Sequence, residues 1–145
     1  MKEFSDGEIK LASDGKWFHD GVEITHERTI ELFNRSIRRE GEKYVLQVGN
    51  EICEVTVEDA PFFVKQVNRE GSKLILFISN GTFEELEPSS LEMGNNNILY
   101  ARIGPYKDRA KFTRPAYYQL MEYLHQDETG GYFLQVENNK YPLTF

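Results

Sequence analysis

The chain contains an internal repeat: residues 17–57 align with residues 105–145 without a gap, at a constant offset of 88 positions. Ten of the 41 aligned pairs are identical, whereas average residue usage yields about two or three identities by chance. The clearest match is YVLQVGN at residues 44–50 against YFLQVEN at residues 132–138. Related segments are expected to fold alike, and the seam between two copies is a favoured place for a ligand.

Local patterns predict a hairpin, a helix and a second hairpin in each copy. In the first copy, Asp20 and Gly21 are expected to form a two-residue turn between short strands. Thr25 is a good N-cap for a helix that ends at Gly41 and carries Ile37 in its apolar stripe. Two strands joined by a short loop complete the copy.

The second copy repeats this pattern, with Thr113 as the helix cap, Gly130 as the stop and a closing hairpin over residues 132–145. The fold class is therefore expected to be α+β, a duplicated hairpin-helix-hairpin unit with mostly antiparallel sheets and two principal helices. The first repeat half spans residues 1–60, and the second half spans 61–145 and contains the copy 105–145. Further strands are expected between the copies, at residues 61–66, 73–79 and 98–102.

Composition narrows the class of protein. A length of 145 residues suits one compact body with two halves. We find no apolar run near the roughly 20 residues of a membrane helix, and no signal-peptide pattern, so the expected location is cytoplasmic. The single cysteine, Cys53, excludes an internal disulfide and a cysteine-rich zinc site. A net charge of −7 argues against nucleic acid as a partner. No cofactor or metal site is predicted.

Positive charge is concentrated between residues 102 and 114. That window contains five basic residues and one acid, Asp108, a net charge of +4 in a chain of −7. At four of the five positions the first copy has His19, Gly21, Glu23 or His26. One interpretation is a phosphate or carboxylate site, with the last of the five in the first turn of the second helix. The alternative is a solvated hairpin whose charges protect a sheet edge. The five are Arg102, Lys107, Arg109, Lys111 and Arg114.

Four other residues are candidates for ligand contact. Trp17, the only tryptophan, or Tyr117 would stack on a flat ligand, while His19 and Asp59 would orient it. Two of them have a structural alternative. Trp17 could instead be an anchor packed on a helix, and His19 a hydrogen-bonded structural histidine.

Two local motifs resemble a known family. The first is Gly15-x-Trp17-x-His19-x-Gly21, and the second is VEDAPF at residues 57–62. The chain thereby resembles the bacterial domain of unknown function 1285 family over most of its length. The resemblance implies a domain duplication, a second half loosely like a pleckstrin-homology fold, and a nucleotide-like ligand at the interface of the two halves, with a role in signal transduction.

These observations favour a binding module over an enzyme. The expected ligand is a small anionic or nucleotide-like molecule at the interface of the halves, held by Arg102, Lys107 and Arg114, with a signalling protein as a further partner and no membrane or nucleic acid. One alternative is a protein-interaction module that uses an exposed sheet edge. Another is an uncharacterised enzyme with Asp59 or His19 as general base.

Overall fold

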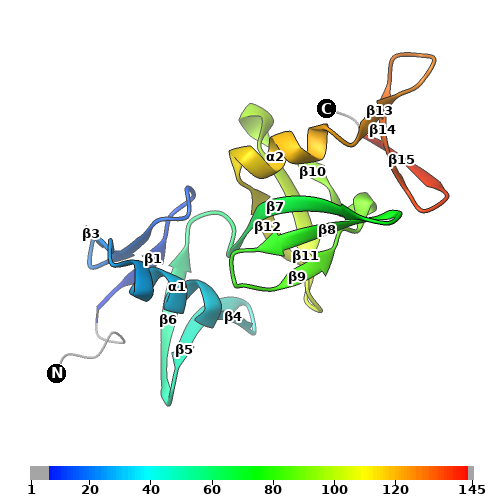
Figure 1. Ribbon diagram of the computed structural model, residues 1–145. Helices are drawn as coiled ribbons and strands as arrows, with labels where there is room; N and C mark the ends of the chain where they lie inside the picture. Colours follow the sequence, from blue (N-terminus) through cyan, green and yellow to red (C-terminus); the bar gives the residue numbers. More distant parts are fainter. Residues whose placement is uncertain (1–6, 144–145) are drawn as a thin grey trace. The chain divides into compact units, whose positions relative to one another are not determined.

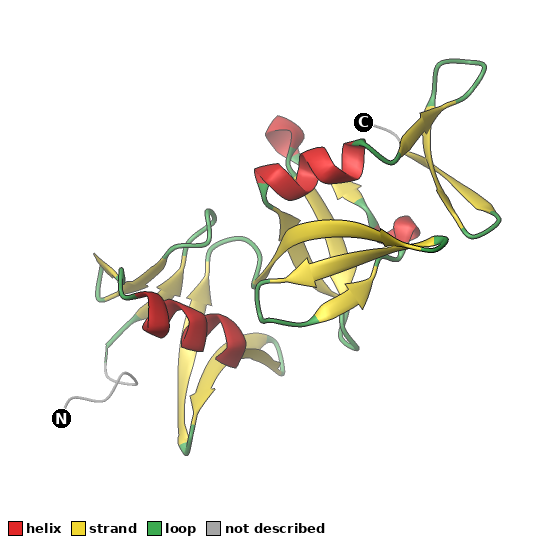
Figure 2. Ribbon diagram, in the orientation of Figure 1, coloured by secondary structure: helices red, strands yellow, loops and turns green. Residues whose placement is uncertain are grey.

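The computed structural model describes residues 7–143, so the last two residues of the predicted closing strand lie outside the described range. The chain divides into two compact units, Met1–Pro61 and Phe62–Phe145, where the sequence predicts a boundary after residue 60. Both units are mainly sheet, and each has one α-helix (Figures 1 and 2). The predicted α+β class, with two helices and mostly antiparallel sheets, is confirmed.

The first unit is built on one six-stranded sheet in the order β3-β2-β1-β6-β5-β4. The contact between β1 and β6 is parallel, and every other neighbouring pair is antiparallel. The sheet thus consists of two three-stranded meanders joined by one parallel pair. Its strands are β1 Ile9–Leu11, β2 Trp17–His19, β3 Val22–Glu23, β4 Ile37–Glu40, β5 Lys43–Val48 and β6 Glu51–Val57.

The predicted turn between β2 and β3 is confirmed. His19 pairs with Val22, which leaves a two-residue loop whose members, Asp20 and Gly21, have φ of +50° and +82°. Positive φ at both central positions is what a type I′ hairpin turn requires, and its twist matches that of the flanking strands. A side chain other than Asn, Asp or Gly would be strained at these positions.

Helix α1 (Glu27–Ser36) lies across one face of the sheet of the first unit (Figure 1). It is shorter than predicted at both ends. Its N-cap is His26 and not Thr25, and it ends five residues before Gly41. Ile37 starts β4 instead of extending the apolar stripe, because it pairs with Leu46 of β5. Strand pairing has here overridden helical periodicity, which is only a weak local preference.

The second unit begins with a six-stranded sheet in the order β10-β11-β12-β7-β8-β9. Its β7–β12 contact is parallel. The sheet again consists of two antiparallel meanders, and the first strand of one meander pairs with the last strand of the other. The strand order is therefore the same in both units, which suggests a duplicated unit. The strands are β7 Phe62–Glu70, β8 Lys73–Ile78, β9 Phe83–Glu85, β10 Glu92–Met93, β11 Leu99–Ile103 and β12 Asp108–Phe112, with short 3₁₀ helices η1 Pro88–Ser90 and η2 Asn95–Asn97.

This second sheet is strongly curved (Figure 2). Its curvature brings the turn after β11 to β9, where the Gly104 N–H donates to Glu84 Oε1 at 3.1 Å. Helix α2 (Arg114–Met121) follows β12 directly and packs on β7, where Gln119 Oε1 accepts the Val67 N–H at 2.7 Å. No helix among residues 7–143 has the length and apolar character needed to cross a membrane.

A separate three-stranded sheet ends the second unit: β13 Leu124–Gln126, β14 Tyr132–Val136 and β15 Asn139–Leu143. It is the counterpart of β4–β6 in the sequence repeat. The register of β14 with β15, in which Tyr132 pairs with Leu143, equals the register of Tyr44 with Val55 shifted by 88 at both positions. The closing hairpins of the two copies therefore correspond residue by residue.

Over the helix and the strand after it, corresponding residues of the two copies are 87 positions apart and not 88. The N-caps are His26 and Thr113, and β4 and β13 begin at Ile37 and Leu124, so each pair is 87 residues apart. The extra residue lies in the loop between β13 and β14, which is longer than the Gly41–Glu42 turn between β4 and β5. The gap-free alignment is thus wrong for the helices. Gly130 belongs to this loop and does not end α2.

Leu46 is fully buried in the first unit, and Leu46→Ala should lower the free energy of unfolding by about 2–5 kcal/mol because it leaves a cavity. Leu32→Ala, at a residue 38% exposed on α1, should cost less than about 1 kcal/mol. Trp17 is buried in the same unit, so its fluorescence during urea unfolding is the measurement. Equal effects of the two substitutions would contradict this core assignment.

Candidate functional site

Strands β11 and β12 place three of the five basic residues of the 102–114 window on one face of the sheet. Arg102 pairs directly with Arg109 in the antiparallel register, so their side chains lie on the same face. Lys111 follows two residues after Arg109 and shares that face. Asp108, the only acid of the window, is 5% exposed and lies on the opposite face. We call Arg102, Lys107, Arg109 and Lys111 the basic hairpin.

The Arg109 guanidinium is held by its neighbours. Its Cζ lies 3.8 Å from the centre of the Tyr100 ring, a cation–π contact, and its Nη2 lies 3.5 Å from Glu92 Oε1. Arg102 is exposed, and its Nη1 donates to the Lys107 carbonyl oxygen at 3.4 Å. Arg109 is therefore fixed in position, whereas the charge of Arg102 faces solvent.

The turn of the basic hairpin adds an aromatic side chain that the sequence analysis missed. Residues 104–107 form this turn, closed by the Lys107 N–H donating to the Gly104 carbonyl at 3.2 Å. Tyr106 lies within it and is 66% exposed. The signal was present, because Pro105 and Gly104 are turn residues and an aromatic side chain at a turn is rarely part of the core. Tyr106 and Lys107 are thus adjacent at the tip.

Arg114 does not belong to this cluster. It follows the other end of β12, and a strand rises about 3.3 Å per residue, so Arg114 lies roughly 20 Å along the chain direction from Lys107. The expected help from the helix N-terminus is also reduced. Thr113 Oγ1 accepts the Ala116 N–H, and Pro115 has no N–H to offer an anion. The structure therefore does not bring Arg114 together with Arg102 and Lys107.

Tyr117 lies at the same end of β12 as Arg114, on α2. Its ring is partly buried and makes an edge contact with Tyr118 at 5.6 Å between ring centres. Tyr118 is 56% exposed, and its hydroxyl lies 3.5 Å from Arg114 Nη1. Tyr117 is thus placed with Arg114 and away from the tip of the basic hairpin.

Trp17 has a structural role in the first unit. It is 1% exposed, its ring meets Phe33 of α1 edge-on at 5.3 Å, and its indole N–H donates to Asn34 Oδ1 at 2.8 Å. A ligand has no access to either face of a ring buried in this way. The expected stacking role of Trp17 is therefore wrong, and the alternative, an anchor packed on a helix, describes it.

His19 and Asp59 are also residues of the first unit. His19, on β2, is partly exposed, and its Nε2 lies 3.8 Å from Asp20 Oδ2. Asp59 is partly buried in the bend after β6. The basic hairpin and Tyr117 belong to the second unit. The predicted ligand residues are thus divided between two units, three in the first and four in the second.

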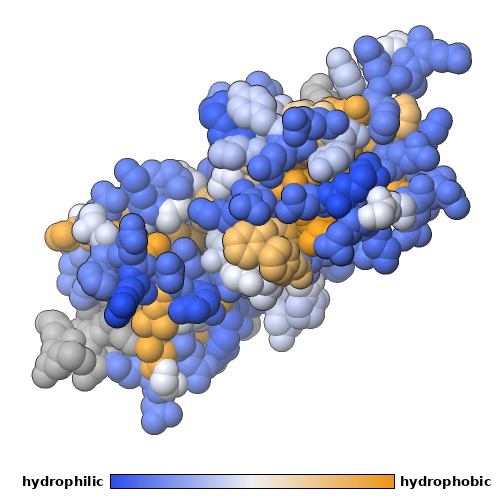
Figure 3. Space-filling view, in the orientation of Figure 1, coloured by the Kyte–Doolittle hydropathy of each residue, from blue (hydrophilic) through white to orange (hydrophobic). Residues whose placement is uncertain are grey.

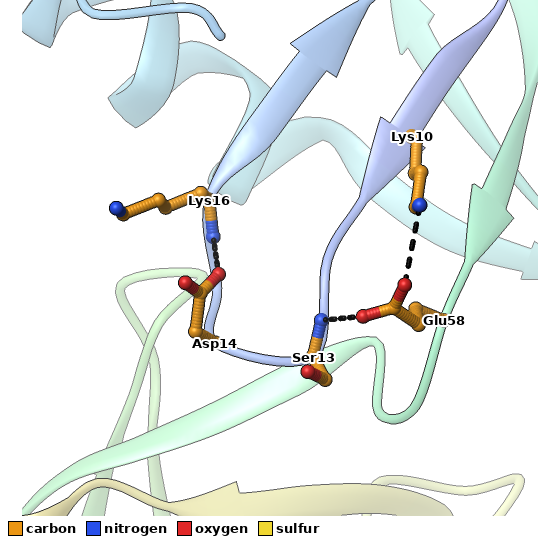
Figure 4. Close-up of polar contacts among 5 residues, drawn as sticks. All are labelled: Lys10, Ser13, Asp14, Lys16 and Glu58. Atoms are coloured by element: carbon orange, nitrogen blue, oxygen red, sulfur yellow. Dashed lines mark hydrogen bonds and ion pairs between the residues drawn. The ribbon is translucent and has the colours of Figure 1, made fainter. Parts of the chain in front are cut away.

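In the motif at residues 57–62, Glu58 makes the polar contacts to the loop between β1 and β2 (Figure 4). Glu58 Oε1 accepts the Ser13 N–H at 2.8 Å, and its Oε2 lies 3.2 Å from Lys10 Nζ. Asp14 accepts the Lys16 N–H at 3.0 Å in the same loop. The Ser13 amide, and after it Lys10, lower the pKa of the Glu58 carboxyl group. Glu58 therefore ties the loop between β1 and β2 to the end of β6.

The described residues support neither a reactive cysteine nor a metal site. Cys53 is buried on β6, and burial raises the pKa of its thiol, which keeps it protonated and unreactive. No group of three or more His, Cys, Asp or Glu side chains within residues 7–143 is placed to hold a metal ion.

Grooves of the second unit lie mostly away from the basic hairpin. One of about 460 Å³ lies between η1, β10 and β15 and shares only Glu92 with the contacts of Arg109. Another of about 420 Å³ lies beside Tyr123 and His125. A ligand of the basic hairpin would therefore rest on an open surface, where charge attraction is weakened by salt.

Comparison with known proteins places the first unit in a family. Residues 2–60 match the domain of unknown function (DUF1285), N-terminal domain. This segment is a DUF1285 N-terminal domain. The family assignment predicted from the two motifs is thereby confirmed. In that domain Trp17 is the buried residue of the first motif. Glu58 of the second motif accepts a hydrogen bond from the loop between β1 and β2.

Two solved DUF1285 family proteins are similar to the chain in fold. The protein from Silicibacter pomeroyi has a TM-score of 0.71 at 22% identity, covering 96% of this chain and 80% of its own. The protein from Shewanella baltica has a TM-score of 0.63 at 20% identity, covering 81% of this chain and 93% of its own. No curated protein matches the chain.

Glu58→Gln should destabilise the DUF1285 N-terminal domain in a pH-dependent way. Because the pKa of Glu58 is lowered in the folded state, its stabilisation is fully present above the ordinary glutamate pKa of about 4.3 and is lost as the pH falls through the lower folded value. Urea unfolding followed by Trp17 fluorescence at several pH values measures this. The gap between wild type and variant should close in acid.

The matched control is Glu42→Gln, at an exposed residue of the turn between β4 and β5. It should show little difference from wild type at any pH. If Glu58→Gln changes the free energy of unfolding by the same amount at neutral and acid pH, the contacts of Glu58 do not depend on its carboxylate charge.

Proposed function

We propose that the protein is a binding module whose second unit holds a small anionic, nucleotide-like ligand on the basic hairpin. The observation that carries the proposal is the direct pairing of Arg102 with Arg109 across β11 and β12. Like charges placed opposite each other destabilise a sheet. Glu92 offsets part of that repulsion at Arg109, and an anion bound beside Arg102 would offset the rest. Guanidinium groups suit phosphate and carboxylate oxygens.

The exposed tip supports a ligand with a flat part as well as a charge. Tyr106 is 66% exposed beside Lys107, so its ring would stack on a planar group while Lys107 and Arg102 contact the anion. Because the surface is open, affinity would come mainly from charge and would fall steeply with salt. These features favour a reversible binding role over catalysis.

A signalling role and a pleckstrin-homology-like second unit are part of the same proposal. The curved six-stranded sheet followed by α2 is compatible with such a fold. In that arrangement ligand binding would alter how a partner protein contacts the unit. Neither point is needed for the anion site itself.

Arg102→Gln should have opposite effects on stability and on binding. Without ligand, the variant should be as stable as wild type or slightly more stable, because a repulsion is removed. With ligand, the thermal stabilisation by pyrophosphate or AMP should fall to about half of the wild-type value at the same ligand concentration, corresponding to about tenfold weaker binding. Wild type at about 100 times the dissociation constant should gain about 2.7 kcal/mol. Differential scanning fluorimetry at low salt is the measurement.

Two further variants complete the design. Arg28→Gln, at an exposed residue of α1 in the first unit, changes the net charge equally and should leave the response intact. Tyr106→Ala should weaken AMP but not pyrophosphate, because only AMP has a ring to stack. If no probe raises the melting temperature, or if Arg102→Gln behaves like Arg28→Gln, the proposed site is wrong.

A further inference from the structure

Strand β9 (Phe83–Glu85) is an unpaired edge with features of a strand-docking site. Within residues 7–143, six strands end a sheet: β3, β4, β9, β10, β13 and β15. Natural edges are commonly protected by basic residues, proline or shortness. Arg38 and Arg39 lie on β4, and Lys140 and Pro142 lie on β15. Strands β3 and β10 have two residues each, and β13 carries the polar residues His125 and Gln126.

Strand β9 is also short and carries two glutamates, but it presents an exposed aromatic ring. Phe83 is 66% exposed, and its ring centre lies 4.9 Å from that of Phe77 on β8. Ile75 lies on the same face of β8, two residues from Phe77. An apolar patch is visible over this hairpin (Figure 3). The outer face of β8 and β9 is therefore apolar next to a free sheet edge.

The backbone of β9 is oriented to accept another strand. The Ile78 N–H donates to the Thr82 carbonyl, and the Leu86 N–H donates to the Leu74 carbonyl, each at 2.8 Å. Bonded and non-bonded pairs alternate in an antiparallel ladder, so Phe83 and Glu85 are non-bonded pairs with β8. Their N–H and C=O groups consequently point away from β8, toward the open edge.

Charge indicates the chemistry of the partner. Three of the five residues from 83 to 87 are acidic, namely Glu84, Glu85 and Glu87. Lys73 Nζ lies 3.4 Å from Glu85 Oε1, an exposed pair of small net stability, so a partner's cation would share the Glu85 carboxylate with Lys73. A second copy pairing antiparallel about Glu84 would place the two Glu84 side chains opposite each other, which is unfavourable. A partner strand with an apolar residue opposite Phe83 and a basic residue opposite Glu85 would complement both side chains. These two positions lie on one face, two residues apart.

We propose that β9 docks an extended segment of a partner protein that carries an apolar residue and a lysine or arginine two residues apart. The docked segment extends the sheet of the second unit by one strand, bonded through the outward N–H and C=O groups of Phe83 and Glu85. Its apolar side chain covers Phe83 and Phe77, and its cation pairs with Glu85. This surface is independent of the anion site, because it uses none of the cations of the basic hairpin.

A fluorescent peptide of two Val-Thr-Lys-Thr repeats is a suitable probe, since valine and lysine alternate on one of its faces. Fluorescence anisotropy should show saturable binding to the full chain. Replacing lysine by glutamate, or methylating alternate backbone nitrogens, should weaken it at least about tenfold. Equal binding of the methylated peptide would mean that charge alone attracts it, and would overturn strand docking.

Three substitutions test the same surface from the side of the protein. Phe83→Pro removes an N–H that points away from β8, so the hairpin should survive while peptide binding falls. Phe83→Thr keeps that N–H but removes the ring, and Glu85→Lys should reverse the preference toward the glutamate peptide. Val22→Thr, at a 70% exposed residue of the edge strand β3, is the control and should bind normally. If Phe83→Pro fails to fold, the other two decide.

Amide hydrogen exchange gives a readout that needs no peptide variant. The Phe83 and Glu85 amides should exchange rapidly in the free protein and become protected in the complex. Protection in the free protein would show that the edge is already covered, and protection that rises with protein concentration would show self-association. Either result, or the absence of peptide binding, would overturn the proposal.

Discussion

The parallel pairing of two sequence-distant strands is the constraint on which each sheet depends. In the first unit β1 lies beside β6, and in the second β7 lies beside β12. A three-stranded meander alone is close to the lower limit of stability. Joining two of them by a parallel pair makes one six-stranded sheet, and the joint is where the core residues Leu11, Val55 and Ala110 are buried. In each unit the chain between the two parallel strands must therefore return to the strand from which it started. This requirement fixes where α1 and the β11–β12 hairpin lie.

Local signals predicted the fold class and several individual elements. The Asp20-Gly21 turn could be predicted because its backbone geometry admits few residue types. The Thr113 cap of α2 could be predicted as well. The C-terminal ends of the helices could not, because Ile37 and Leu124 satisfy a helical spacing and a strand pairing equally well, and the pairing is decided by residues distant in sequence. The shared strand order of the two sheets also escaped sequence reasoning, since it relates segments with no visible identity.

The candidate site was predicted in part. Charge clustering correctly indicated the β11–β12 hairpin as the place where cations gather, because alternation along one strand puts Arg109 and Lys111 on one face. Linear proximity misled for Arg114, since a few strand residues separate it from the hairpin tip by more than a side chain can reach. Trp17 misled in another way, because it is distinctive as a buried residue that holds the first unit together. In the second motif Asp59 was chosen, whereas Glu58 makes the contacts to the loop between β1 and β2. Tyr106 was overlooked because the repeat aligns it with Phe18, a residue of a predicted strand and not of a turn.

Over the helices, the gap-free sequence alignment of the two copies and the structure disagree by one residue. One residue along a helix is a rotation of about 100°, so a position aligned by sequence can point to solvent in one copy and to the core in the other. Leu32 and Leu120 are identical in the gap-free alignment, yet the first is 38% exposed and the second fully buried. Phe33 is the true counterpart of Leu120.

The closing sheet β13–β15 has no parallel partner like the one that completes β4–β6. Among the described residues its backbone link to the neighbouring sheet is the Glu137 N–H, which donates to the Ser72 carbonyl at 2.9 Å. A sheet held in this way can open without breaking the six-stranded ladder beside it. In terms of cooperativity, such opening would also expose Leu134 and Val136, which are buried on β14, so we expect this sheet to be a foldon of intermediate stability.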